Sequence, residues 1–153
     1  MRLTKLSDYA LRVLMYAEAN KDQLITIEET SRVYNISRTH LMKVVNILVR
    51  EGFLKGVRGR SGGFTLGKDP KDINIGAVIR ATEPDFALVE CFLTGNQCNI
   101  TGSCKLPNIF NEAVGSFLAT LEKYTLADIV LQRRKFNLSR LDRTADRQLP
   151  TDQ

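Results

Sequence analysis

The first twenty residues carry apolar side chains at intervals of three and four, the spacing of one face of an α-helix. On the other side of this helix lie Asp8 and Arg12, four residues apart. The pattern predicts a helix from about Thr4 to Asn20, and its charges distinguish it from the unbroken apolar stretch of a signal peptide. The apolar face consists of Leu6, Tyr9, Ala10, Val13, Leu14 and Ala17.

Two further helices follow, separated by a tight connection. Thr26 and Glu29 have the spacing of a capping box, which predicts a helix from Thr26 to about Tyr34. Ser37 caps a third predicted helix over residues 38–51, and a glycine follows it. Two helices joined by about three residues are typical of a helix-turn-helix.

A β-hairpin is predicted directly after the third helix. Residues 53–57 and 64–66 have the composition of short strands, and Gly59, Gly62 and Gly63 provide the turn between them. A hairpin in this position is a wing. The first part of the chain therefore predicts a winged helix-turn-helix that reads DNA.

The second part of the chain predicts a short helix over 75–82, a Gly-rich cysteine loop and a long amphipathic helix over 106–123. The wide apolar face of the long helix has no evident local partner, so we expect a dimer interface, with packing on the first helix as the alternative. Thr125 and Asp128 cap a last short helix to about Arg133. The apolar face consists of Leu106, Ile109, Phe110, Ala113, Val114, Phe117, Leu118 and Leu121.

These elements predict a mainly α protein with a small β-hairpin. Residues 1–83 would form the winged helix-turn-helix DNA-binding domain, and 84–104 a cluster-binding loop. Residues 105–133 would form the dimerisation helix region, and we expect 134–153 to be a disordered tail because it is polar and lacks periodicity.

Charge is distributed unevenly along the 153 residues. Residues 1–67 hold 11 Lys and Arg against six Asp and Glu, whereas residues 68–153 hold 11 of each. The entire net charge of +5 therefore falls in the winged part, which favours a polyanion such as double-stranded DNA as partner. No apolar run is long enough to cross a membrane, so we expect a cytoplasmic protein without a membrane partner.

The third predicted helix has an apolar side for the core and a polar stripe opposite it. We assign the N-terminal residues to groove contacts and the later ones to phosphates, because a recognition helix enters the groove with its N-terminal end. The alternative is a solvated helix face, but two arginines among glycines at the wing tip favour DNA, since arginine suits the minor groove. The assigned residues are Arg38, Thr39, His40, Lys43, Asn46, Arg50, Arg58 and Arg60.

The only three cysteines, Cys91, Cys98 and Cys104, lie within fourteen residues of a Gly-, Asn- and Thr-rich segment. A disulfide would leave one thiol over, and gaps of six and five residues differ from the close pairs of structural zinc sites. A thiol redox switch stays open, as does an iron–sulfur cluster completed by one outside ligand. We find no Gly-rich phosphate loop, catalytic Cys–His pairing or paired carboxylates that would indicate an enzyme.

Residues 1–133 resemble the NsrR/IscR group of winged-helix iron–sulfur repressors, and most of all its nitric-oxide-sensing branch. The resemblance is carried by the stretches LTKLSDYALRVLMY, SRTHLMKVVNILVREGFL, VRGRSGGFTLG, INIGAVIRATEP, VECFLTGNQCNITGSCKL and FLATLEKYTLADIV. It implies a homodimeric repressor of nitric oxide detoxification genes with one cluster per subunit. The three cysteines match the group's ligand positions.

The resemblance also bears on the fourth ligand. In one branch a histidine after the third cysteine serves, but Lys105 follows here and the only histidine is His40. In the other branch an aspartate on the partner's first helix completes a 4Fe-4S cluster, and this chain has Asp8 there. Arg12 would hold the Asp8 carboxylate in place, although a plain Asp8–Arg12 ion pair is the alternative. Water, a thiol or Glu90 as ligand, a 2Fe-2S cluster and a zinc or thiol regulator stay open.

Overall fold

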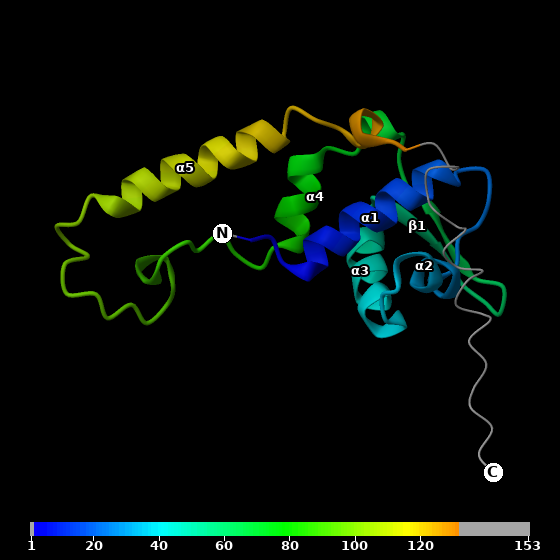
Figure 1. The fold of residues 1–153 in the computed structure, drawn as a ribbon, viewed down its shortest axis with the longest axis horizontal. Helices are drawn as coiled ribbons and strands as arrows, with labels where there is room; N and C mark the ends of the chain where they lie inside the picture. The colour runs from blue at the N-terminus through cyan, green and yellow to red at the C-terminus, as the bar shows by residue number, and fades with distance from the viewer. Residues whose placement is uncertain (1, 132–153) are drawn as a thin grey trace, which may run out of the picture.

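The computed structural model describes residues 2–131. Three helices, a hairpin and a fourth helix form one body, from which a loop and a fifth helix extend (Figure 1). Residues 132–153, including the predicted tail and the predicted end of the last helix at Arg133, lie outside the described part. The elements are α1 (Lys5–Ala19), α2 (Ile27–Tyr34), α3 (Arg38–Arg50), β1 (Leu54–Val57), β2 (Gly63–Leu66), η1 (Pro70–Asp72), α4 (Ile75–Thr82), η2 (Glu90–Phe92), α5 (Leu106–Leu121) and η3 (Leu126–Ile129).

The predicted capping residues start the first three helices. The hydroxyl oxygens of Thr4, Thr26 and Ser37 each accept a hydrogen bond from the backbone N–H three residues later. The capping box predicted at Thr26 is formed on the threonine side, whereas the Glu29 carboxylate accepts a hydrogen bond from the Tyr16 hydroxyl of α1. Glu29 thus ties α2 to α1 as well as belonging to the first turn of α2.

The core of the winged domain lies where α1, α3, α4 and the hairpin meet. The apolar faces predicted for the three helices supply it. Most of these side chains are shielded almost completely from solvent, while Leu6 and Tyr9 of α1 are partly buried at its edge. Burial of a Val, Leu or Ile side chain contributes about 1.5–3 kcal/mol, so this core stabilises the domain. Its most deeply buried members include Val13, Leu14, Leu41, Val44, Leu48, Phe64, Val78 and Ile79.

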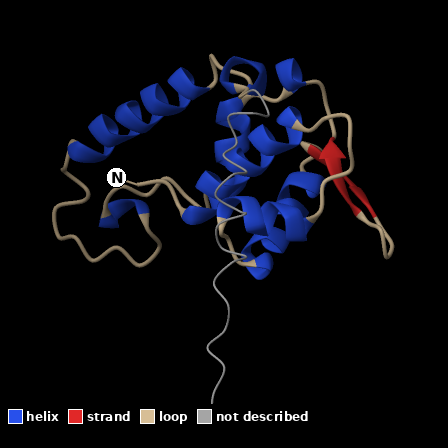
Figure 2. Cartoon of the chain, turned by 45° about the vertical axis from the view of Figure 1, so that its right-hand side comes forward, coloured by secondary structure: helices blue, strands red, loops and turns tan. Residues whose placement is uncertain are grey.

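The hairpin forms the wing beside the helices (Figure 2). β1 and β2 are antiparallel, with Leu54 opposite Leu66 and Val57 opposite Gly63. Gly59 has φ +118°, a left-handed conformation that favours glycine at the tip. The side chain of Phe64 anchors β2 in the core, while Val57 is 44% exposed. The hairpin base is fixed and its tip is open to solvent.

Helix α5 contacts the winged domain mainly through α4. Its C-terminal end packs on α4, where Leu118 is buried and Arg80 binds Glu122 with Nη2 to Oε1 at 2.6 Å. Towards the N-terminal end, Leu106 is 52% and Ile109 58% exposed. The main packing of α5 is therefore on α4 rather than on the first helix, which the sequence left as an alternative, and much of its apolar face is open.

The fold class expected from the sequence is confirmed: the described residues are mostly helical, with one two-stranded hairpin. Helix α4 has the predicted bounds, and α5 ends two residues before the predicted Lys123. The predicted cap at Thr125 and Asp128 forms a full capping box, but the element it opens is a short 3-10 turn, η3.

Candidate DNA interface and cluster loop

The polar stripe of α3 lies on the surface beside the wing. Every residue assigned to DNA from the sequence is exposed, on α3 and on the hairpin tip alike. The opposite side of α3 places Leu41, Val44 and Leu48 in the core. This burial fixes the rotation of the helix about its axis and thereby presents Thr39, Lys43 and Asn46 outward together.

The cations of this surface differ in their partners. Arg38 forms an ion pair with Glu28, and Arg50 forms one with Glu51, Nε to Oε1 at 3.0 Å. Lys43 and the two wing arginines have no such carboxylate among residues 2–131. Exposed pairs contribute little, about 0–1 kcal/mol, so phosphates can displace Glu28 and Glu51 at small cost.

His40 lies against α1 as well as on the exposed stripe. Its ring centroid is 6.4 Å from that of Tyr9, and the Tyr9 ring lies 5.9 Å from the guanidinium carbon of Arg12. Among residues 2–131, His40 does not join the cysteines in a group that could hold a metal ion. Nearby, burial raises the pKa of Tyr34, whose hydroxyl donates to the Arg12 carbonyl oxygen at 2.9 Å.

The cysteine loop connects α4 to α5 and is held by hydrogen bonds within itself. The Asn96 side-chain oxygen accepts from the Cys98 N–H at 2.9 Å, and the Thr101 hydroxyl donates to the Cys98 carbonyl at 2.8 Å. Glu90 accepts from the Gln97 N–H at 3.1 Å. These local turns fix Cys98 within its loop without packing the loop on the winged domain.

All three cysteines are free thiols; Cys98 is exposed, and Cys91 and Cys104 are partly so. Within residues 2–131, no three His, Cys, Asp or Glu side chains are gathered closely enough to hold a metal ion. The chain by itself therefore places the thiols on one loop without bringing them to one point.

Asp8 and Arg12 form the ion pair that the sequence offered as an alternative to a ligand role. Arg12 Nε donates to Asp8 Oδ1 at 3.0 Å, and Nη2 lies 2.7 Å from Oδ2. Both side chains are about half exposed, at 47% and 45%. A pair this exposed contributes only about 0.3–0.5 kcal/mol, so a better partner for the Asp8 carboxylate can replace it.

A junction that the sequence did not reveal ties the start of α1 to the end of α4. The Glu83 carboxylate accepts hydrogen bonds from the Thr4 N–H at 2.8 Å and the Thr4 hydroxyl at 3.1 Å. The Ser7 and Thr82 hydroxyls bond to each other at 2.8 Å and are buried. The only signals were Ser7 on a face of otherwise apolar residues and the capping residue Thr4.

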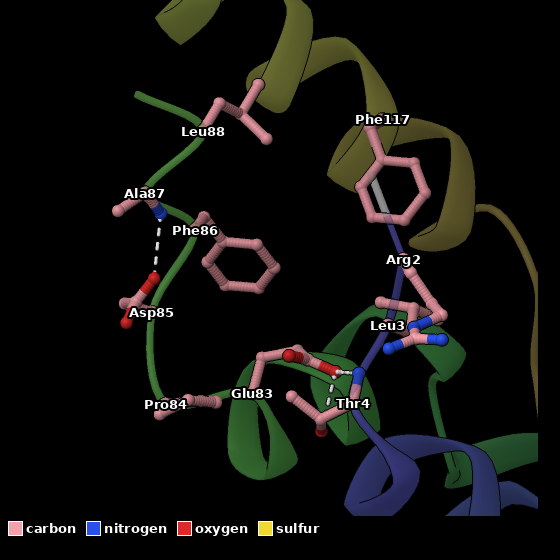
Figure 3. A pocket seen from close by; sticks show the side chains of 10 residues that line it. All are labelled: Arg2, Leu3, Thr4, Glu83, Pro84, Asp85, Phe86, Ala87, Leu88 and Phe117. Atoms are coloured by element: carbon pink, nitrogen blue, oxygen red, sulfur yellow. Dashed lines mark hydrogen bonds between the residues drawn. The ribbon is translucent and has the colours of Figure 1, made fainter. Parts of the chain in front are cut away.

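Beside this junction lies a pocket of about 380 Å³ (Figure 3). The start of the chain, the linker after α4 and helix α5 all line it. Phe86 of the linker and Phe117 of α5 point towards the pocket, with Arg2 near the α5 side (Figure 3). The linker that leads to the cysteines thus meets both the segment before α1 and helix α5 here.

Comparison with known proteins identifies the family. Residues 3–132 match the family model Rrf2, described as "Iron-dependent Transcriptional regulator". The HTH-type transcriptional regulator NsrR of Bacillus subtilis is 48% identical over 132 residues, 85% of this chain and 90% of that protein. NsrR of Bacillus licheniformis is 45% identical over 135 residues, 87% of this chain and 94% of that one.

Solved structures agree on the fold. T. potens IscR superimposes with a TM-score of 0.65 at 19% identity, covering 99% of this chain and 94% of that one. No helix of residues 2–131 is long and apolar enough to span a membrane. The relatives are named transcriptional regulators, so the chain is a DNA-binding protein and not an enzyme. Because the match extends over nearly all the described residues, the chain belongs to the Rrf2 family of iron-dependent transcriptional regulators.

Proposed function

We propose that this chain is a homodimeric repressor that senses nitric oxide through an iron–sulfur cluster and controls genes of nitric oxide detoxification. The observation that carries the proposal is the position of three free thiols on the loop between the winged domain and an apolar, exposed helix. The similarity to proteins named NsrR supports the signal and the targets.

The donor set fits a cluster. Thiolates are the usual ligands of iron–sulfur clusters, and Cys91, Cys98 and Cys104 are the chain's only thiols. A Cβ added at Gly95 or Gly102 would meet no atom within 4 Å, so the loop has open space around it. We assign the three cysteines as ligands of a cluster, of which 4Fe-4S is the form favoured and 2Fe-2S the alternative.

We assign Asp8 of the partner subunit as the fourth ligand. The Asp8 carboxylate is half exposed and held by Arg12 alone among the described ion pairs, whereas Glu90 bonds within its own loop. Arg12 would keep the carboxylate oriented. A carboxylate binds iron more weakly than a thiolate, so the iron beside it would be the one most open to nitric oxide.

Helix α1 connects this ligand to the DNA-reading helix. Asp8 lies one turn after Thr4 on α1, and α1 packs directly on α3. Release of Asp8 from the cluster would free α1 relative to the loop of the other subunit. The spacing or orientation of the two recognition helices would then change, and operator binding with it.

Substitution of Asp8 tests the sensor. We expect Asp8→Ala, purified without oxygen, to have an altered cluster absorbance spectrum and an altered response to nitric oxide. Asp22→Ala removes an exposed carboxylate from the turn after α1 and serves as the matched control. An Asp8→Ala protein with the wild-type spectrum and wild-type nitric oxide response would contradict the assignment of Asp8 as a ligand.

The DNA assignment has its own test. Arg60→Ala and Arg38→Ala should weaken binding to an operator duplex in a gel-shift titration at fixed salt, and leave the cluster spectrum intact. Unchanged binding by both variants would refute the assignment. A thiol or zinc regulator without iron is the second candidate, because the free thiols fit it too; an iron and sulfide assay on protein purified without oxygen separates the two.

A further inference from the structure

A cavity of about 250 Å³ lies between the start of α1 and the recognition helix α3. The side chains of Leu6 and Val44 supply apolar lining, and Val44 belongs to the buried core. The polar lining comes from both helices: Lys5 and Tyr9 from α1, His40 and Lys43 from α3. Two segments far apart in the sequence thus present cations and a phenol to one hollow.

The cavity carries uncompensated positive charge. Lys5 and Lys43 are exposed, and neither forms a salt bridge with a carboxylate of residues 2–131. Carboxylates near the start of α1 are engaged elsewhere: Arg12 binds Asp8, and Thr4 binds Glu83. No Asp or Glu lines the cavity. The two ammonium groups are therefore available to an anion from solvent.

The cavity also borders the surface assigned to DNA. His40 and Lys43 belong to the polar stripe of α3, and the Tyr9 ring lies 6.4 Å from the His40 ring, centroid to centroid. A helix that occupies the major groove is flanked by phosphate backbones, and contacts to these phosphates fix its register and orientation. A backbone phosphate of DNA would thus lie beside α3.

We propose that this cavity binds one backbone phosphate of the operator. Lys5 and Lys43 neutralise its charge, while the Tyr9 hydroxyl and the His40 ring N–H donate hydrogen bonds to its oxygens. Lys5 and Tyr9 thereby become DNA-positioning residues on α1, outside the helix-turn-helix and wing. The inference rests on the proposed entry of α3 into the groove and adds a second helix to the interface.

Salt dependence of operator binding by the full-length protein tests the charge. We expect Lys5→Ala to lower the slope of log K against log salt concentration by about 0.9 for each phosphate that the variant no longer neutralises. Tyr9→Phe should keep the slope and weaken binding about tenfold, the effect of one hydrogen bond to a charged group. Lys123→Ala removes an exposed lysine just after α5 and serves as the matched control.

Replacement of single operator phosphates by neutral methylphosphonates tests the phosphate interaction itself. Single methylphosphonates are placed along the operator, and binding by wild type and Lys5→Ala is compared at each position. We expect one position per half-site where the neutral linkage weakens wild type but has little effect on the variant. The same response of the two proteins at every position would overturn the proposal, and so would a Lys5→Ala slope equal to that of Lys123→Ala.

Arg60→Ala, measured beside these variants, separates this inference from the DNA assignment it rests on. Weakened binding by Arg60→Ala together with wild-type behaviour of Lys5→Ala rejects only the phosphate cavity. Wild-type binding by both Arg60→Ala and Arg38→Ala rejects the wing and α3 as the DNA-reading surface. If the cavity bound a free phosphate compound instead of DNA, the difference in binding between wild type and Lys5→Ala would be the same at every methylphosphonate position.

Discussion

The winged domain and the region that follows it differ in how far one chain completes them. From α1 to α4, apolar faces meet in a shared core, and side chains such as Leu41, Val78 and Phe64 are almost wholly shielded from solvent. In the region beyond α4, the side chains of Leu93, Ile100, Leu106 and Ile109 remain more than half exposed. The three thiols lie in this second region.

This difference indicates which functions a single subunit can perform. The winged domain fixes α3 by its own packing, so DNA reading by the proposed homodimer would need only the correct spacing of two such domains. The second region exposes apolar side chains and thiols that a partner subunit and a cluster would cover. We therefore regard the second region as the part that completes its structure on assembly, and hence the part that can be switched.

Matched truncations of leucine give the largest expected contrast. Leu41→Ala, at a fully buried position of α3, should lower the free energy of unfolding by about 2–5 kcal/mol because it leaves a cavity. Leu93→Ala, at a position 52% exposed in the loop, should change it by no more than about 0.5 kcal/mol. Urea unfolding measures both values. Decreases of similar size would remove the distinction between the two regions.

A charge on α5 probes the proposed dimer interface. Ile109→Asp should raise the dimer dissociation constant by about 30-fold or more, as expected for a buried interface residue worth about 2 kcal/mol. Sedimentation equilibrium provides the measurement. Asn108→Asp introduces the same charge at the neighbouring exposed polar position and should leave the constant nearly unchanged. An Ile109→Asp protein as dimeric as wild type would exclude this face from the interface.

The Thr4–Glu83 junction, at the end of α4 where the second region begins, is the third point to test. Glu83→Ala removes both hydrogen bonds to Thr4 and should lower the free energy of unfolding by about 1–2 kcal/mol. It should also reduce the ratio of operator affinities between cluster-loaded and cluster-free protein. Asp85→Ala removes a linker carboxylate that accepts a hydrogen bond from the Ala87 N–H, and is the control. A wild-type affinity ratio in Glu83→Ala would show that the junction does not couple cluster loading to operator affinity.

The smallest effect concerns the cap of η3. Hydrogen bonds from the Thr125 backbone N–H and hydroxyl hold the pKa of Asp128 below its ordinary value of 3.8. Its contribution to stability is therefore present above pH about 4 and is lost as the pH falls through the lowered value. Asp128→Asn should make the melting temperature less sensitive to pH between about 5 and 2. An equal sensitivity in wild type and variant would contradict this cap.

Local patterns predicted most of the fold. Apolar spacing and capping residues predicted α1 and α3 to within about a residue, because those signals lie within the helices themselves. The capping box predicted that the Glu29 carboxylate would accept a hydrogen bond from the backbone of Thr26. This was wrong, because its partner is Tyr16 of another helix. The Thr4–Glu83 hydrogen bonds join residues 79 apart and leave no local pattern.

The candidate site was predictable in kind but not in geometry. Cysteine spacing and the exposed stripe of α3 identify the residue types, because these depend on the sequence alone. Convergence of the thiols does not follow from the chain by itself, since the ligands of the proposed cluster would be gathered by the group they bind. Likewise, the cavity between Lys5 and Lys43 arises from the packing of α1 on α3.

The central claim is that Asp8 of one subunit and the cysteines of the other hold one cluster. A heterodimer of an Asp8→Ala chain and a chain with all three cysteines replaced by serine tests it, by native mass spectrometry on protein prepared without oxygen. If ligation crosses the subunits, the heterodimer has one complete site and retains one cluster under chelator challenge as well as a wild-type site does, whereas the Asp8→Ala homodimer loses its clusters faster. A heterodimer that loses its cluster as fast as the Asp8→Ala homodimer would contradict the account.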